Sequence, residues 1–413
     1  MGIESIPPAV VVQVTVQADW TDVVADVLRL NNTASFWVSC YKRGSPSVHG
    51  SAKVSVVGDH KVEFTGDGIV LETLSNYSFT VKVPEYDNYA VKVFGTTRRT
   101  NIPKISCLDV SPEGALFVTG SEDGIIRVGE TESGRMTQEL KGHFQYVNSC
   151  QFFPSGQVIL SGGGDFLLKI WSALDGSCPV TMKGHVKPIS DTAIIDRGRN
   201  VVSSSNDGTV KLWEVASGTT IRTLASHGDR INAIDVGTWE TPLESKIPLD
   251  SKEVATEGKL VVAVSENGTL YGLDVRASEE AFQRRSYNKA PLRSVAFSEQ
   301  HSLVASGTSE GVVEVFDIRK QDEVLSRHQR STAGISSLVF KRTEDSLSLV
   351  VGCDDSGLYE TSSVTDALIQ VRREYVGYDL DGPCRVRLVG SGPGLVSASK
   401  EGGMLRFSKT LLV

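Results

Sequence analysis

Short runs of apolar residues alternate with turn-forming residues along most of the chain. In one representative stretch the apolar runs cover residues 147–153, 158–162 and 167–171, and the turn sequences PSG and GGGD separate them. Runs of this length, bounded by Gly, Pro, Asp and Ser and lacking a helical period, are typical of β-strands. The pattern predicts an all-β chain.

The strand pattern recurs with a fixed period. The tripeptide KGH ends at His143 and again at His185, 42 residues later, and ASH ends at His227 after the same interval. Trp171 and Trp213 end the segments KIW and KLW with the same spacing. A period of about 40–45 residues with a Gly-His pair and a Trp-Asp-like end is the signature of WD-repeat β-propellers, which have four strands in each blade.

Weaker copies extend the repeat in both directions. The segment that contains the third turn and third strand occurs at residues 120–129, 162–171, 205–214, 265–274, 307–317, 352–360 and 397–407. We therefore expect seven blades, and the predicted fold is a seven-bladed WD-repeat β-propeller.

The N-terminal region lacks the repeat. Residues 1–88 alternate like strands and predict a small β-rich N-terminal domain, which leaves residues 89–413 for the propeller. Only SKTLLV follows Phe407, so the last blade is short of its outer strand. We expect residues 89–98 to supply that strand and close the ring, because closure removes an exposed strand edge.

One blade contains an insertion. Asp207 and its counterpart Asn267 are 60 residues apart instead of 42. The surplus, residues 238–257, is polar and contains two prolines. It predicts a surface loop between the first two strands of the fourth blade.

Two successive blades carry the same four residue types. They are His143, Ser161, Asp165 and Trp171 in one blade and His185, Ser203, Asp207 and Trp213 in the next. A catalytic site occurs once in a chain, so a repeated set indicates a structural role. We expect each His to hydrogen-bond its Asp, with Ser and Trp on either side of the pair, because a buried carboxylate needs partners.

The remaining motifs do not support an enzyme. GTSEG at residues 307–311 matches the nucleophile elbow of hydrolases, but a predicted strand follows it where the elbow requires a helix. GSGPG at residues 390–394 lacks the Lys of a phosphate-binding loop. Neither an H-E-x-x-H motif nor zinc-ligand spacing occurs. The sequence predicts no catalytic residues, no cofactor and no metal.

Composition narrows the class of partner and the compartment. Lys and Arg total 42 and Asp and Glu total 50, so the net charge of −8 disfavours nucleic acid and favours a basic protein surface. Six cysteines without a C-x-x-C pair indicate buried thiols in a reducing compartment. We find no membrane-spanning run and no signal peptide. We expect a cytoplasmic protein, present also in the nucleus, that is monomeric when free.

Two longer segments point to one family. CQFFPSGQVILSGGGDFLLKIWSA at residues 150–173 and DTAIIDRGRNVVSSSNDGTVKLW at residues 191–213 resemble the proteasomal ATPase-associated factor family. The N-terminal extension, the sequence FWVSC within it and the insertion also fit that family, and the strong similarity covers residues 102–237.

The resemblance implies a non-catalytic chaperone for assembly of the proteasome regulatory particle. Members of the family bind the C-terminal domains of ATPase subunits of the base and restrain premature docking onto the proteolytic core. The residues alone leave an alternative open, in which the propeller is a scaffold or a substrate receptor in another complex such as a ubiquitin ligase.

The candidate partner-binding residues lie on loops at one rim of the propeller. Each of them either precedes the Asp position of a repeat or follows the Gly-His position: Glu122, Tyr146, Asp191, Asn206, Arg230, Glu266, Arg293 and Lys400. Loops on a rigid scaffold suit recognition. We expect Tyr146 to be an apolar anchor and the acidic members, Glu122, Asp191 and Glu266, to pair with Lys or Arg of an ATPase subunit.

Overall fold

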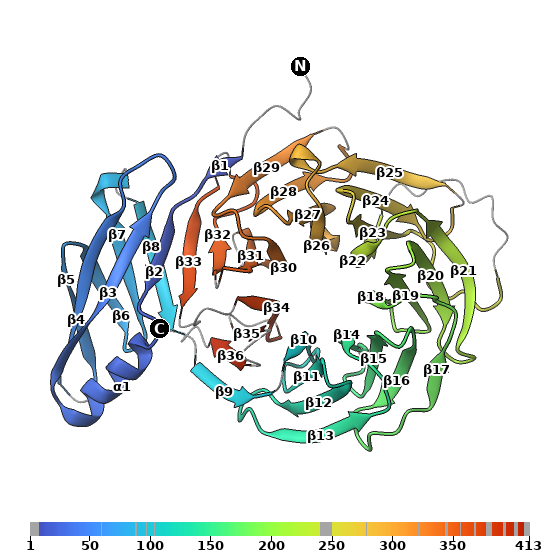
Figure 1. Cartoon of the computed structure of the whole chain (residues 1–413), viewed down its shortest axis with the longest axis horizontal. Helices are drawn as coiled ribbons and strands as arrows, with labels where there is room; N and C mark the ends of the chain where they lie inside the picture. The colour runs from blue at the N-terminus through green and yellow to red at the C-terminus, as the bar shows by residue number, and fades with distance from the viewer. Residues whose placement is uncertain are drawn as a thin grey trace.

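The repeat region forms a ring of antiparallel sheets (Figure 1). The computed structural model describes residues 8–408 except 59, 87–88, 96, 103, 240–249, 278, 321–322, 343–345, 356, 367–368, 377–381, 391–393 and 400–403. In this part of the chain seven sheets follow one another around the ring, and we number them as blades one to seven in chain order. The innermost strand of each blade contacts that of the next, and the innermost strand of blade seven contacts that of blade one. The prediction of an all-β fold is confirmed.

The first three blades contain the clearest copies of the repeat. Blade one consists of β10 (Ile105–Val110), β11 (Leu116–Ser121), β12 (Ile125–Glu130) and β13 (Met136–Lys141). Blade two consists of β14 (Val147–Phe152), β15 (Val158–Gly163), β16 (Leu168–Ser172) and β17 (Val180–Met182). Blade three consists of β18 (Ile189–Ile195), β19 (Asn200–Ser205), β20 (Thr209–Glu214) and β21 (Thr219–Ser226).

The next three blades keep the same order of strands. Blade four consists of β22 (Ile231–Thr238), β23 (Lys259–Ser265), β24 (Thr269–Asp274) and β25 (Glu280–Arg285). Blade five consists of β26 (Leu292–Ser298), β27 (Leu303–Thr308), β28 (Val312–Asp317) and β29 (Val324–Gln329). Blade six consists of β30 (Ile335–Arg342), β31 (Leu347–Cys353), β32 (Leu358–Thr361) and β33 (Val371–Val376).

Most of the hydrophobic core lies between neighbouring blades. Trp171 of blade two packs in one cluster with Val118 and Ile126 of blade one, and Trp213 of blade three packs with Leu168 of blade two. Both tryptophans are 1% exposed. Each sheet is therefore covered on both faces, which is why the middle strands contain nearly continuous apolar runs. Burying a side chain of this size contributes roughly 2–3 kcal/mol.

Blade seven is completed by a strand from the other end of the chain. It consists of β34 (Pro383–Leu388), β35 (Leu395–Ser399), β36 (Met404–Ser408) and β9 (Thr97–Asn101), and β9 pairs antiparallel with β36. The closing strand was expected at residues 89–98, but it lies at Thr97–Asn101, so the predicted position is wrong for most of its length. Tyr89–Gly95 forms a separate strand, β8, because its inward side chains Val91 and Val93 are fully buried in the core of the N-terminal domain. The repeat period locates the closing segment only to within a few residues.

The N-terminal domain is a two-layer β-structure with one helix. One sheet consists of β2 (Gln13–Val16), β3 (Thr33–Tyr41), β4 (Val48–Val56) and β5 (Val62–Asp67), and the other contains β6 (Val70–Ser75), β7 (Ser78–Val83) and β8 (Tyr89–Gly95). Trp20 forms the centre of the domain core, with its ring centroid 5.5 Å from that of Phe36 and 5.3 Å from that of Phe79.

Short 3-10 helices occur at Pro84–Tyr86 in the N-terminal domain and at Tyr287–Lys289 and Glu299–His301 in the propeller.

The helix α1 (Trp20–Leu30) was not predicted. Its buried residues Trp20, Val24 and Val27 follow the helical spacing i, i+4, i+7, and Asn31 ends it in the left-handed conformation. The sequence signal was therefore present, but it lies between segments that alternate like strands.

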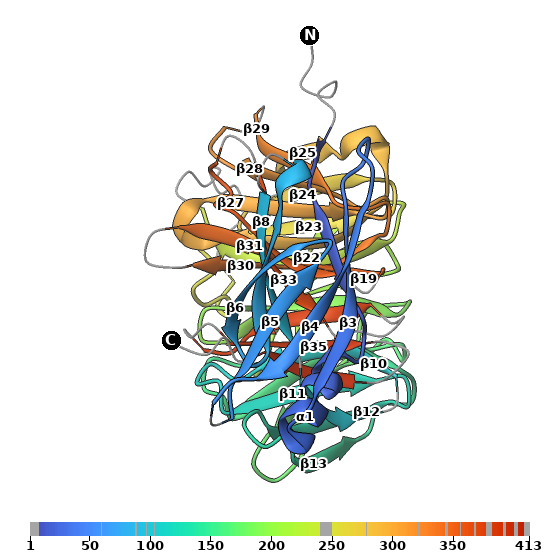
Figure 2. The ribbon, with the colours of Figure 1, turned by 90° about the vertical axis from the view of Figure 1, so that its left-hand side faces the viewer.

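The domain is joined to the ring by backbone pairing. β8 pairs in parallel with β33 of blade six, so one sheet runs continuously from the propeller into the domain. A second short strand, β1 (Ala9–Val10), pairs in parallel with β29 of blade five. Figure 2 looks onto the side of the ring that the domain covers.

The insertion connects β22 to β23, but its described part is not a detached surface loop. Residues 240–249 lie outside the described chain, whereas residues 250–258 fold back onto blade three. Asn200 donates a hydrogen bond of 3.0 Å to the carbonyl of Lys252 and accepts one of 2.7 Å from the N–H of Val254. These contacts give the surplus residues a packing role that their polar composition did not indicate.

Candidate protein-binding rim

Each repeated set of four residues forms a hydrogen-bonded chain. In blade two, Trp171 Nε1 lies 2.8 Å from Ser161 Oγ, Ser161 Oγ lies 2.7 Å from His143 Nε2, and His143 Nδ1 lies 2.9 Å from an Asp165 carboxylate oxygen. The ionised carboxylate can only accept, so Nδ1 carries the imidazole proton. The hydroxyl then donates to Nε2 and accepts from the indole. Ser and Trp therefore lie on the same side of the histidine, which corrects the expected arrangement around the His–Asp pair.

The acidic end of each chain holds two loops together. The backbone N–H of Phe144 donates to Asp165, and the N–H of Val186 donates to Asp207 in the same way. Burial alone would raise the pKa of Asp207, but hydrogen bonds from Thr209, His185 and backbone N–H groups outweigh it and lower the pKa to about 2. The His143 and His185 side chains are fully buried, so a substrate cannot reach them. The geometry supports a structural role, in which the sets stiffen the rim loops.

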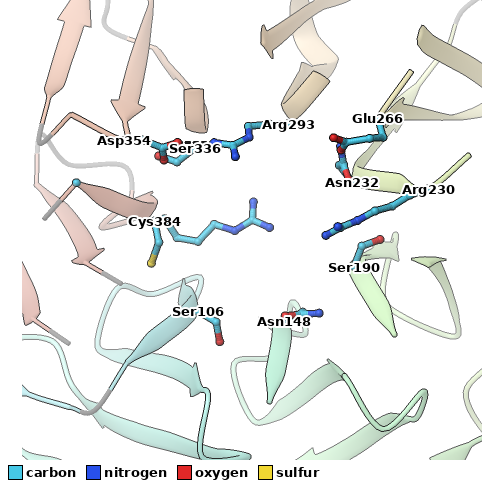
Figure 3. A pocket seen from close by; sticks show the side chains of 12 residues that line it. Ser106, Asn148, Ser190, Arg230, Asn232, Glu266, Arg293, Ser336, Asp354 and Cys384 are labelled. Atoms are coloured by element: carbon cyan, nitrogen blue, oxygen red, sulfur yellow. Dashed lines mark hydrogen bonds and ion pairs between the residues drawn. The ribbon is translucent and has the colours of Figure 1, made fainter. Parts of the chain in front are cut away.

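Three of the predicted rim residues line a cavity at the mouth of the ring (Figure 3). The cavity has a volume of about 590 Å³, and Arg230, Glu266 and Arg293 contribute to its wall. Arg293 forms an ion pair with Asp354, and Glu266 accepts a hydrogen bond of 2.8 Å from Asn232. The cavity thus contains both signs of charge, already partly paired with each other.

Asp191 does not belong to the rim. It is 6% exposed and accepts hydrogen bonds from the Ser149 hydroxyl and from the backbone N–H of Ile234, and it forms an ion pair of 3.5 Å with Arg385 of blade seven. The loop that follows His185 ends at Ile189, where β18 begins. Asp191 is therefore a strand residue between blades, and its prediction as a partner-binding residue is wrong.

The other predicted rim residues differ in their exposure and in the bonds that their side chains form. Glu122 pairs with Lys104 at 3.0 Å, and Asn206 has a buried side-chain oxygen without a hydrogen-bond partner. Tyr146 is 36% exposed. Lys400 lies outside the described residues.

An apolar group around Tyr146 was missed by sequence reasoning. Phe144 is 86% exposed, Phe166 38% and Val186 73%, and all three lie on rim loops of blades two and three. We call Phe144, Tyr146, Phe166 and Val186 the blade-two patch. Exposed aromatic residues gathered on loops are typical of protein-binding surfaces. The available signal was Phe166 itself, which stands where the copies 42 residues away on either side have Gly124 and Gly208.

The described residues contain few features of other site types. No group of three or more His, Cys, Asp or Glu among them is arranged to hold a metal ion. Within the same residues no helix is long and apolar enough to cross a membrane. All six cysteines are free thiols, and Cys40, Cys107, Cys150 and Cys353 are buried.

Comparison with known proteins agrees with the repeat and with the family resemblance. The family model "WD domain, G-beta repeat" matches residues 95–128, 134–172 and 176–214, and the model "Nucleolar protein 10-like, N-terminal domain" matches residues 229–359. The chain is 44% identical over 276 residues to a Gallus gallus protein named proteasomal ATPase-associated factor 1. The aligned region covers 65% of this chain and 69% of the relative.

Two further relatives carry related names. The Homo sapiens proteasomal ATPase-associated factor 1 is 35% identical over 143 residues, covering 33% of this chain and 35% of the relative. The Dictyostelium discoideum probable proteasomal ATPase-associated factor 1 is 30% identical over 145 residues, covering 34% and 33%. The matched part of the chain thus spans about a third of the length of these two relatives.

Proposed function

Because this chain belongs to the family of proteasomal ATPase-associated factors, we propose that it is a non-catalytic assembly chaperone that binds proteasome ATPase subunits through their C-terminal domains. The observation that carries the proposal is the combination of this kinship with a rim that displays the blade-two patch. In this proposal the chaperone acts as a monomer, in the cytoplasm and the nucleus, and restrains premature docking onto the proteolytic core.

The propeller suits this task because its rim loops are presented on a rigid frame. The hydrogen-bonded chains that end at Asp165 and Asp207 fix the backbone of the loops that carry Phe144 and Val186. Little conformational entropy is then lost when a partner docks, which favours affinity. The Phe144 and Val186 side chains on these loops are 86% and 73% exposed and so accessible to a partner.

The proposal is tested by presenting the purified chain with candidate partners. The full chain is immobilised and incubated with separately expressed C-terminal domains of the proteasome ATPase subunits, and in parallel with cullin-type ligase components. We expect at least one ATPase domain to be retained, and fully assembled proteasomes to be excluded. Retention of ligase components without any ATPase domain would contradict the proposal and favour a substrate receptor.

A further inference from the structure

Phe166 combines a left-handed backbone conformation with a side chain that is 38% exposed. We infer that the blade-two patch is the anchor of the partner-binding rim, and that it receives an apolar segment flanked by carboxylates. This inference rests on the proposed function and names the surface and the chemistry of the partner, which the kinship with other proteins does not.

The first observation is the backbone at Phe166. Its φ is +69°, in the left-handed region. The same turn in four other blades has a glycine there: Gly124, Gly208, Gly268 and Gly311 have φ between +77° and +81°. A bulky residue is unfavourable in this region, whereas glycine is not. Phe at this position therefore carries a conformational cost that the glycine-containing turns avoid, which makes it a candidate for a role other than stability.

The second observation is that the loops carrying the patch residues lie against the turn that contains Phe166. A side-chain carbon added to Gly164 would lie 2.7 Å from the ring of Tyr146, so the ring packs directly against the turn that leads to Phe166. A side-chain carbon added to Gly124 in blade one would lie 2.9 Å from the carbonyl oxygen of Gln145 and 3.1 Å from that of His143, both on the following loop.

The repeat predicts the same contact in blade two, between the turn and the loop that follows the blade's last strand. The counterparts of Gly124, His143 and Gln145 one repeat later are Phe166, His185 and Lys187. Phe166 therefore faces the loop that carries Val186. The Phe144 N–H bonds to Asp165 of this turn and the Tyr146 ring packs against Gly164, while the repeat places the Val186 loop next to Phe166.

The third observation concerns the charges beside the patch. Lys183 and Lys187 flank Val186, and both are exposed. In the described part of the chain no carboxylate forms an ion pair with either lysine. The nearby acidic rim residue Glu122, by contrast, is paired with Lys104 at 3.0 Å. The uncommitted charge next to the patch is positive, so the complementary partner segment carries Asp or Glu beside its apolar side chains.

The experiment measures affinity for the ATPase domain that the wild-type chain retains. The test variants are F144N/F166N, which removes two aromatic side chains and keeps a residue that tolerates the left-handed conformation, and K183E/K187E. The matched controls are L174N, which removes an apolar side chain that is 70% exposed outside the patch, and K53E, which reverses an exposed lysine of β4. Melting temperatures check that all variants fold.

We expect F144N/F166N to weaken binding by at least about tenfold at every salt concentration, because hot-spot aromatics dominate interface energies. K183E/K187E should weaken binding by about three- to tenfold at low salt, with a smaller loss at high salt. L174N and K53E should bind like wild type.

The two levels of the proposal fail in different ways. If the wild-type chain binds no ATPase domain, the proposed function fails and this inference fails with it. If the wild type binds and F144N/F166N binds equally well in its folded form, the anchor lies elsewhere and only this inference is overturned. Tighter binding by K183E/K187E would show that the partner segment is basic, which also overturns it.

Discussion

Glu253 of the insertion accepts two hydrogen bonds from the guanidinium of Arg222 in blade three, at 2.6 and 2.9 Å. The glutamate side chain is fully buried and that of Arg222 is 16% exposed. Arg222 also donates to the carbonyl of Val275, which follows β24 of blade four. An inserted segment thus connects two neighbouring blades at their outer edge.

We predict that E253A lowers the free energy of unfolding by about 2–4 kcal/mol, because it leaves a mostly buried guanidinium without its carboxylate. Chemical denaturation followed by tryptophan fluorescence measures the change. The exposed neighbour Glu257 supplies the control, since E257A should alter stability by less than about 0.5 kcal/mol. Equal effects of the two substitutions would show that the insertion does not stabilise the ring.

The hydrogen-bonded chain of blade three should contribute to stability and to nothing chemical. D207A is expected to lower the free energy of unfolding by about 2–3 kcal/mol, because His185, Thr209 and the N–H of Val186 all lose their acceptor. D123A in blade one is the comparison, because Asp123 bonds only within its own turn and strand, to Arg127 and the N–H of Ile125, at a partly exposed site without a histidine partner among the described residues. Similar melting temperatures for the two variants would contradict a structural role for the chain.

The Asp207 carboxylate also makes the free energy of unfolding depend on pH in the acidic range. The folded-state pKa of Asp207 is lowered to about 2 from an ordinary value of 3.8. Its stabilising contribution is therefore present above about pH 4 and is lost as the pH falls toward 2. Thermal denaturation at pH 7 and at pH 2.5 should show a smaller difference between D207A and wild type in acid; an unchanged difference would exclude this linkage.

Asp235 of β22 is expected to show the opposite dependence on pH. It is partly buried where blades four and five meet, and desolvation raises its pKa to about 6 although the N–H groups of Phe297 and Val236 donate to it at 2.8 and 2.9 Å. Its folded-state pKa exceeds its ordinary value, so its ionisation opposes folding as the pH rises through about 6.

We predict that the stability of D235N relative to wild type is higher at pH 8 than at pH 4, by about 1–3 kcal/mol, because asparagine does not ionise. The N–H groups of Val236 and Phe297 donate to different carboxylate oxygens, so the single asparagine oxygen keeps only one of the two hydrogen bonds. That loss is present at both pH values and does not affect the comparison between them. D196N, a substitution at an exposed aspartate, should show no such difference between the two pH values. A D235N variant less stable at pH 8 than at pH 4, relative to wild type, would contradict the raised pKa.

Closure of the ring predicts different outcomes for two truncations. Deletion of residues 1–95 removes the N-terminal domain but retains β9, so the product should unfold in one cooperative transition. Deletion of residues 1–101 removes β9 and exposes the edge of β36, which favours aggregation. Size-exclusion chromatography and calorimetry distinguish the two products. A soluble, cooperative product of the longer deletion would show that β9 is dispensable.

The repeat made much of the propeller predictable from sequence, because one period governs turns, strands and buried positions together. His143, Asp165 and Trp171 could be assigned to a structural chain since the same residues recur 42 positions later. Phe166 could have been found in the same way, as an exception to the Gly of other copies. The N-terminal domain has no repeat, so its helix α1 had to be recognised from a single short amphipathic segment and was missed.

By itself the sequence determined the strand-and-turn unit, its period and the residue types of the hydrogen-bonded chains, since all of these are set by contacts within one repeat. Only the tertiary structure decided the features that depend on distant segments. Asp191 became buried because Arg385 comes from a blade nearly two hundred residues away in the chain, and Tyr89–Gly95 joined the N-terminal domain because β7 and β33 flank it. Local patterns carry no information on which strand or charge will be brought alongside, because that choice is made by packing of the whole ring.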